Sequence, residues 1–195
     1  LDGPVNELCE MIDEWQVSHK DYDLPQEVYD FVKEKGFFSF IIPKEYGGLE
    51  FSPLGLIYVM AKIGSRSGTL ASMGGVPNSL GPAELLMHYG TDEQKKELLP
   101  KLASGEHVPC FALTGPYAGS DATSMPDTGI VCKGEFEGEE IIGIKLNFSK
   151  RYITLAPIAT LIGLAFKMYD PDHLIGETEN YGITCALLPN GTKGL

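Results

Sequence analysis

The stretch Ala112-Leu113-Thr114-Gly115-Pro116-Tyr117-Ala118-Gly119-Ser120-Asp121-Ala122 marks the point where the sequence pattern changes from helical to strand-like. An apolar, strand-like segment leads into it, and a loop of small and hydroxylated residues follows. A loop with so little side-chain bulk lets backbone N–H groups and hydroxyls approach an anion or a planar heterocycle closely. An ordinary surface turn has the same composition, so composition alone leaves both interpretations open.

Before this stretch, apolar residues repeat with helical spacing and are expected to face a core. They do so at Val5, Leu8, Cys9 and Ile12, at Val28, Phe31 and Val32, at Leu56, Ile57 and Met60, at Ala83, Leu86 and Met87, and at Leu98, Leu99 and Leu102. Ser52 is placed to cap the third of these helices. Thr91 with Gln94 forms a capping box for the last one. Glycines such as Gly74 and Gly75 are typical of the turns between helices.

After Pro109 the pattern changes to that of strands. Apolar residues alternate with glycine or polar residues at Ile142, Ile144, Leu146 and Phe148, which predicts a half-buried strand. Residues 158–166 form a continuous apolar run that suits a central strand. Shorter strands are expected at residues 111–114, 130–133 and 183–188.

Helices that come first and strands that follow predict an α+β chain with two domains. We expect an all-helical domain over residues 1–106 and an incomplete antiparallel β-barrel or sandwich over residues 107–195. Five strands do not complete such a domain, so we expect the chain to continue beyond Leu195.

Composition limits the partners that the chain can bind. Of its 195 residues 43% are apolar, which is enough for one large or two small cores. Its 27 Asp and Glu outweigh 15 Lys and Arg, and no basic stripe is present to neutralise nucleic-acid phosphates. We therefore expect no nucleic-acid partner. The longest apolar run is also too short to span a bilayer.

The four cysteines, Cys9, Cys110, Cys132 and Cys185, lie far apart and form no CxxC pair. Neither a zinc site nor a redox motif is therefore expected. Lone cysteines at apolar positions are typical of reduced core residues in a reducing compartment. We expect a cytoplasmic protein without a metal ion, and membrane association only through a segment outside residues 1–195.

Five motifs, in this order along the chain, resemble the acyl-CoA dehydrogenase family. They are Ile42-Pro43-Lys44-Glu45-Tyr46-Gly47-Gly48-Leu49, Asn78-Ser79-Leu80-Gly81, Gly90-Thr91-Asp92-Glu93-Gln94-Lys95, a match to Thr-Glu-Pro-x-x-Gly-Ser-Asp at Thr114, Pro116, Gly119, Ser120 and Asp121, and Tyr152-Ile153-Thr154. No single motif is decisive, but the ordered set covers nearly the whole chain. The sequence at residues 77–82 and 110–114 is most similar to that of the bacterial long-chain fatty acyl-CoA dehydrogenase of β-oxidation, whose chain is much longer.

The resemblance implies an FAD site. By their place in the family motifs, the cofactor contacts would be Phe111, Leu113, Thr114, Gly119, Ser120, Tyr152, Ile153 and Thr154. The Thr114 hydroxyl would hydrogen-bond the isoalloxazine edge, and Ser120 would also meet the pantetheine arm of the substrate. Tyr152 stands where the family usually has Trp beside the flavin; the alternative for this residue is an aromatic side chain packed into the β domain.

The resemblance also implies a reaction, the α,β-dehydrogenation of a fatty acyl-CoA to trans-2-enoyl-CoA. A glutamate would take the α-proton while FAD takes a hydride from the β-carbon. In the family that glutamate lies in a C-terminal helical domain, so we expect no catalytic residue in this fragment, and no activity from the fragment alone. The implied partners are the acyl-CoA, electron-transfer flavoprotein or a similar acceptor, and further copies of the full-length chain in a homo-oligomer.

Two residues depart from the family pattern, because Gly115 replaces a Glu and Leu155 replaces an Asn. A flavin monooxygenase of the same fold and a non-catalytic member of that fold stay open as alternatives. Two smaller questions also stay open. Asn78 either lies near the acyl-chain cavity or belongs to a turn between helices, and Lys150-Arg151 is either a solvated strand end or a phosphate contact.

Overall fold

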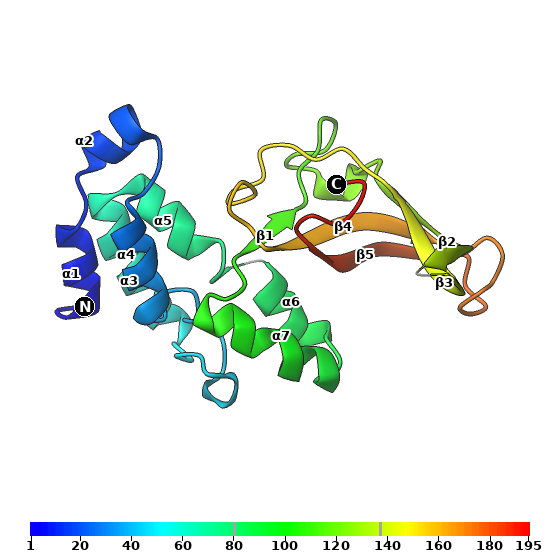
Figure 1. The fold of residues 1–195 in the computed structure, drawn as a ribbon, viewed down its shortest axis with the longest axis horizontal. Helices are drawn as coiled ribbons and strands as arrows, with labels where there is room; N and C mark the ends of the chain where they lie inside the picture. Colours follow the sequence, from blue (N-terminus) through cyan, green and yellow to red (C-terminus); the bar gives the residue numbers. More distant parts are fainter. Residues whose placement is uncertain (80, 137) are drawn as a thin grey trace. The chain divides into compact units, whose positions relative to one another are not determined.

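The computed structural model describes residues 1–79, 81–136 and 138–195, which divide into two compact units (Figure 1). Unit 1 comprises Leu1–Cys110 and Thr154–Leu161. Unit 2 comprises Phe111–Ile153 and Ile162–Leu195. The chain thus leaves unit 1, builds most of unit 2, returns briefly to unit 1 and then completes unit 2.

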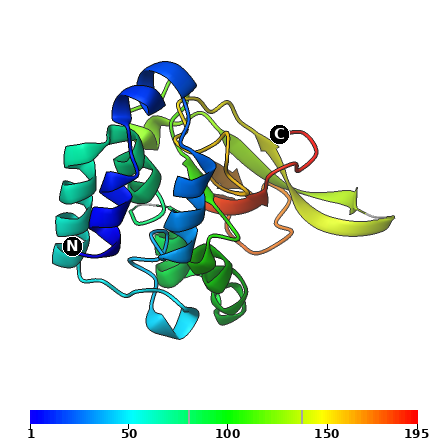
Figure 2. The same cartoon turned by 60° about the vertical axis from the view of Figure 1, so that its left-hand side comes forward.

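Unit 1 is built mainly from helices. They are α1 (Pro4–Glu10), α2 (Glu14–Gln16) with the π-helical turn η1 (Val17–Asp21), α3 (Gln26–Glu34), the 3-10 turn η2 (Lys44–Tyr46), α4 (Pro53–Arg66), α5 (Gly68–Gly75), α6 (Pro82–Tyr89) and α7 (Asp92–Ser104). Helix α1 packs against α3 and α4, and α6 packs against α7 (Figure 2). The helices predicted from apolar spacing are all present, whereas α2 and α5 were not predicted.

The starts of two helices follow directly from the sequence. The Ser52 hydroxyl accepts a hydrogen bond from the amide of Gly55 at the start of α4. At α7, the Thr91 hydroxyl accepts from the Gln94 amide at 3.2 Å, and the Gln94 side chain accepts from the Thr91 amide at 2.9 Å. The predicted capping box is therefore confirmed, and it satisfies two amides that the helix leaves unpaired.

The core of unit 1 corrects two details of the sequence analysis. Ile57 is 61% exposed, because the inward face of α4 is instead formed by residues at i, i+3, i+4 and i+7, namely Leu56, Val59, Met60 and Ile63. Gly74 and Gly75 lie inside α5 and not in a turn. A Cβ atom on Gly75 would lie 3.6 Å from the Met60 side chain, an ordinary contact distance, where α5 packs against α4.

Unit 2 carries most of a five-stranded sheet. Its strands are β1 (Pro109–Ala112), β2 (Thr128–Phe136), β3 (Glu139–Asn147), β4 (Leu161–Tyr169) and β5 (Asn180–Pro189), and the 3-10 turn η3 (Ala122–Ser124) precedes β2. The order is β1-β4-β2-β3, and β5 also pairs with β4. Strand β4 thus pairs with three others, which confirms the prediction of a central strand in the apolar run.

The α+β class with an open sheet is confirmed, but the sheet is mixed and not purely antiparallel. Strand β2 pairs with β3 in antiparallel register, from Thr128↔Asn147 to Phe136↔Glu139. It pairs with β4 in parallel register, from Thr128↔Lys167 to Ile130↔Tyr169. A parallel pair needs a long crossover connection, which here includes β3 and the segment after it. The alternation of apolar and polar residues within a strand does not show whether such a connection follows, so the sequence could not predict the parallel pairing.

The predicted strand at β3 exists but is less buried than its alternation suggested. Ile142 and Ile144 are 51% and 42% exposed. Only Leu146 and Phe148 pack against the cluster around Leu164. The outer part of the β2–β3 hairpin extends beyond this core, as Figure 1 shows, so its apolar side chains remain accessible.

Two further expectations concern the burial of the cysteines and segments that could span a membrane. All four cysteines are free, and Cys110 is buried as expected, but Cys185 in β5 is exposed. The prediction that Cys185 is a core residue was therefore wrong. Within the described ranges, every helix is too short or too polar to cross a bilayer.

Candidate functional site

The loop predicted after β1 leaves that strand without becoming helical. The Gly115 amide donates to the Ala118 carbonyl at 3.0 Å, which closes a turn that exposes Tyr117. Ala118 and Met125 are buried together with Ala165 of β4, so the loop is anchored to the sheet at two points. The predicted strand end followed by a loop is confirmed.

Several polar groups of this loop are available to a ligand. The Thr114 and Ser120 hydroxyls form no hydrogen bond within residues 1–79, 81–136 and 138–195, and the same holds for the Gly119 and Ser120 amides. Gly119 is exposed, and a Cβ atom placed there would meet nothing within 4 Å. The loop therefore offers unpaired donors with little bulk around them, which suits a ligand with anionic groups.

Asp121, in contrast, is already engaged. Its carboxylate accepts hydrogen bonds from the hydroxyls of Ser124 and of Thr123, the latter at 2.8 Å. These bonds, from Ser124 first and Thr123 second, lower the pKa of Asp121 below its usual value. Asp121 is thus ionised at neutral pH and holds the start of η3.

This arrangement predicts a dependence of stability on pH. Because the pKa of Asp121 is lower in the folded state, its contribution is present above the unfolded value of about 3.9 and is lost as pH falls through the folded value. The urea midpoint of the parent should exceed that of Asp121→Asn at pH 7, and the difference should become smaller when the pH is lowered to about 2.5. A difference that is constant between these pH values would contradict the prediction.

A second segment lies beside the loop. The Arg151 amide donates to the Thr114 carbonyl at 3.1 Å, and the Arg151 guanidinium donates to the Pro116 carbonyl at 3.3 Å. The next residue, Tyr152, is 83% exposed, so its ring does not pack into the β domain. Its ring faces the Arg151 guanidinium at 5.1 Å, and Ile153 packs against the sheet core.

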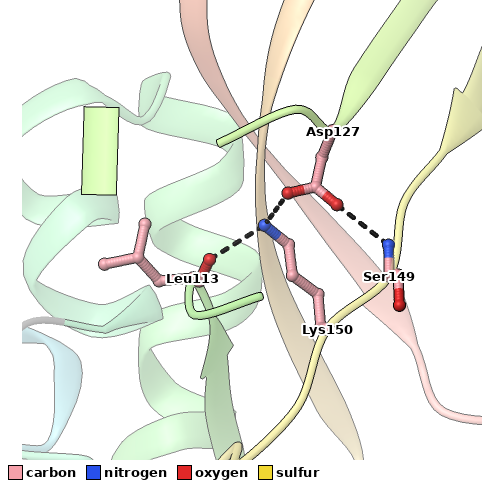
Figure 3. Close-up of polar contacts among 4 residues, drawn as sticks. All are labelled: Leu113, Asp127, Ser149 and Lys150. Atoms are coloured by element: carbon pink, nitrogen blue, oxygen red, sulfur yellow. Dashed lines mark hydrogen bonds and ion pairs between the residues drawn. The ribbon is translucent and has the colours of Figure 1, made fainter. Parts of the chain in front are cut away.

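A buried ion pair joins the two segments (Figure 3). The Lys150 Nζ atom lies 2.6 Å from Oδ2 of Asp127 and donates to the Leu113 carbonyl at 2.9 Å. The other oxygen of Asp127, Oδ1, accepts from the Ser149 amide at 2.9 Å. The side chains of Lys150 and Asp127 are only 5% and 2% exposed.

Neither interpretation drawn from the sequence for Lys150 is correct, because it is not solvated and its charge is paired with Asp127. Arg151 remains exposed. The sequence analysis missed Asp127 altogether. A signal was present, since Lys150 has the same parity as the inward-facing Leu146 and Phe148, and alternate residues of an extended chain share a face.

Of the predicted cofactor contacts, the structure brings Leu113 and Thr114 together with the segment of Tyr152 and Ile153. Phe111 lies in β1 and packs against the buried anchor of the loop. Gly119 and Ser120 follow the turn. Thr154 belongs to unit 1, where it lines an apolar hollow.

Unit 1 contains an apolar hollow of about 430 Å³. It is lined by Leu56, Ile57, Met60, Ser72, Gly75, Val76, Asn78, Ser79 and Thr154. The Asn78 side chain donates to the carbonyls of Phe37 and Gly74 and accepts from the Phe40 amide, so it holds a turn and also borders the hollow. Leu80 of the same motif lies outside the described residues.

Comparisons with known proteins show which family this chain resembles in sequence and fold. The family model described as acyl-CoA dehydrogenase, N-terminal domain, matches residues 5–106. A 3-(aryl)acrylate reductase of Clostridium sporogenes is 37% identical over 140 residues, which are 72% of this chain and 35% of the relative. An acyl-CoA dehydrogenase of Bacillus subtilis is 29% identical over 192 residues, 98% of this chain and 44% of the relative. The chain spans less than half the length of these relatives.

A solved structure extends the similarity beyond the helical region. The FAD complex of PigA has a TM-score of 0.77 and 26% sequence identity, and the match covers 99% of this chain and 47% of that one. The family model covers just over half of the chain, and the fold match covers nearly all of it. The chain described here therefore belongs to the acyl-CoA dehydrogenase family.

Proposed function

We propose that residues 1–195 form the front part of an FAD-dependent acyl-CoA dehydrogenase, which converts a fatty acyl-CoA to the trans-2-enoyl-CoA. The observation that carries this proposal is the loop after β1, which lies beside the exposed Tyr152. Among the described residues, its Thr114 and Ser120 hydroxyls and its Gly119 and Ser120 amides form no hydrogen bond. Family membership supports the reaction type, and the FAD bound in the similar PigA structure supports the cofactor.

The residues present fit an FAD. We propose that its contacts are Phe111, Leu113, Thr114, Gly119, Ser120, Tyr152, Ile153 and Thr154. The free hydroxyls of Thr114 and Ser120 are suitable donors to polar ring atoms and to phosphate oxygens, and Gly119 adds no bulk in their way. When bound, FAD supplies an acceptor for the hydride from the substrate's β-carbon. The residues of this chain would bind and orient the FAD, and Ser120 would also bind the pantetheine arm of the substrate.

The base that removes the α-proton is not assigned within this chain, because the two acidic residues between β1 and β2 are engaged, Asp121 with two hydroxyls and Asp127 with Lys150. We propose that the base is a glutamate of a helical domain beyond residue 195. The proposed domains of this chain are 1–106 and 107–195, and the electron acceptor is electron-transfer flavoprotein or a similar protein. We also propose that the full-length chain forms a homo-oligomer.

For the substrate, we propose a long-chain fatty acyl-CoA of β-oxidation. The relatives include a reductase named for aryl acrylates, so family membership alone does not select a fatty acid. Support comes from the hollow in unit 1, since Leu56, Met60 and Val76 offer an apolar lining that suits an alkyl chain.

The full-length protein, assayed with palmitoyl-CoA and butyryl-CoA and an artificial electron acceptor, tests the proposal. We expect enoyl-CoA formation with a higher kcat/KM for palmitoyl-CoA. A flavin-bearing protein that turns over no acyl-CoA would contradict it, and rapid oxygen consumption with product hydroxylation would favour a monooxygenase. Residues 1–195 alone should be inactive and retain FAD weakly, so FAD that co-purifies with them at one per chain would refute this part.

A further inference from the structure

We propose that the buried Lys150–Asp127 pair positions the two segments that contact the flavin, Leu113–Thr114 and Tyr152–Ile153, relative to each other. This inference rests on the proposed flavin site. Neither Lys150 nor Asp127 is among the proposed contacts, so both are positioning residues that act through the backbone they hold. We call the pair, together with Leu113 and Ser149, the Lys150 clamp.

The clamp ties together three separate pieces of unit 2 (Figure 3). Lys150 reaches from the segment after β3 to the Leu113 carbonyl, at the end of β1. Asp127 lies just before β2 and accepts from both Lys150 and the Ser149 amide. Its own carbonyl accepts from the Lys167 amide of β4 at 2.9 Å. The clamp is thus fixed to the central strand.

The neighbouring backbone repeats the same link. The Leu113 carbonyl accepts from Lys150, and the next carbonyl, that of Thr114, accepts from the Arg151 amide. Two consecutive residues of one segment are therefore joined to two consecutive residues of the other. This double link therefore also fixes the position of the next two residues, Tyr152 and Ile153.

Gly115 shows how closely the clamp draws the segments together. A Cβ atom at this position would lie 2.9 Å from the Ser149 carbonyl oxygen, closer than real Cβ contacts allow, and 3.8 Å from Asp127. The obstacle is backbone and not a flexible side chain. In this chain the close approach of the two segments therefore favours glycine at a position where the family pattern has Glu.

A buried ion pair is better suited to fixing geometry than to adding stability. The desolvation of two charges offsets much of their attraction, so the net contribution of such pairs to stability is small. Breaking one partner, however, leaves the other charge buried and the local structure free to rearrange. We therefore expect loss of the clamp to change flavin binding more than a comparable loss elsewhere in unit 2.

The experiment compares variants of the full-length chain in their FAD dissociation constants. Asp127→Asn should weaken FAD binding about tenfold, the effect expected when a charged hydrogen bond that holds the site is lost. Asp170→Asn is the matched control, because Asp170 is fully buried in unit 2 and accepts from the Leu174 and Ile175 amides at 2.9 Å. Its FAD dissociation constant should stay within about twofold of the parent's.

A double variant, Asp127→Leu with Lys150→Met, guards against simple misfolding, because it leaves no unpaired buried charge. It should keep the parent's urea midpoint and still bind FAD about tenfold more weakly. Equal losses of FAD affinity in Asp127→Asn and Asp170→Asn, or an unchanged affinity in the double variant, would overturn the proposal.

Amide hydrogen exchange of the FAD-free chain tests the clamp separately from the flavin site. In Asp127→Asn the Arg151 amide, which reports the link to Thr114, should exchange at least tenfold faster than in the parent. It should be unchanged in Asp170→Asn. If the parent binds no FAD, the proposed function fails, but the exchange measurement still decides whether the clamp holds the two segments. An unchanged Arg151 rate would overturn the clamp itself.

Discussion

Replacing Asn78 by alanine is expected to destabilise unit 1 by about 3–5 kcal/mol, because it leaves several buried backbone groups without partners. The Asn78 side chain is 2% exposed. It donates to the carbonyls of Phe37 at 2.6 Å and Gly74 at 2.8 Å, and accepts from the Phe40 amide at 2.7 Å. Each such group costs about 1–3 kcal/mol when it is buried without a hydrogen bond.

Native-state hydrogen exchange of amides in α3 and α5 measures this loss within unit 1. The control is Ser79→Ala, since Ser79 is exposed and its hydroxyl makes only a long bond of 3.4 Å to the Val76 carbonyl. The control should change stability by less than about 0.5 kcal/mol. A loss below about 1 kcal/mol for Asn78→Ala would mean that the polar contacts of this side chain are not what holds the turn.

The second large effect is expected from Gly129→Ala in β2. A Cβ atom at Gly129 would lie 2.4 Å from the ring of the fully buried Phe166 and 2.8 Å from the Ile144 side chain. Overpacking of this kind costs about 1–3 kcal/mol, and the close contact with a fully buried ring places this variant at the upper end. Because Asp127 lies two residues before Gly129, a displaced β2 should also disturb the Lys150 clamp.

The matched control for this variant is Gly143→Ala on the paired strand β3. There a Cβ atom would meet only the Ile141 side chain at an ordinary 3.7 Å. Alanine should therefore be neutral or stabilise by about 0.4–1 kcal/mol through the unfolded chain. Exchange rates of β4 amides in the two variants give the comparison, and similar rates in both would show that Gly129 is not limited by space.

What the sequence predicted well was local. The capping box of Thr91 and Gln94 spans three residues, and the apolar run at β4 is continuous, so both could be recognised without knowing the fold. Ile57 was misplaced because a short apolar run does not show which of two adjacent faces is inward until the neighbouring helix is known. The parallel pairing of β2 and β4 likewise depends on a crossover outside either strand.

What the sequence could not supply was the long-range polar contacts. Asn78 bonds to residues 38 and 41 positions away, and Lys150 bonds to Asp127 23 positions away, and no periodicity links such pairs. The candidate flavin contacts came from resemblance to a family and not from spacing. Their cofactor role remains a prediction, while the availability of the Thr114 and Ser120 hydroxyls is a property of the structure.

The central claim is that the loop after β1 and the adjacent Tyr152–Ile153 segment hold a flavin. Residue-resolved amide hydrogen exchange of the full-length chain, with and without FAD, tests it most directly. We predict slower exchange on FAD binding at Thr114, Gly119, Ser120 and Ile153. FAD binding that protects amides elsewhere and leaves these four unchanged would contradict the account.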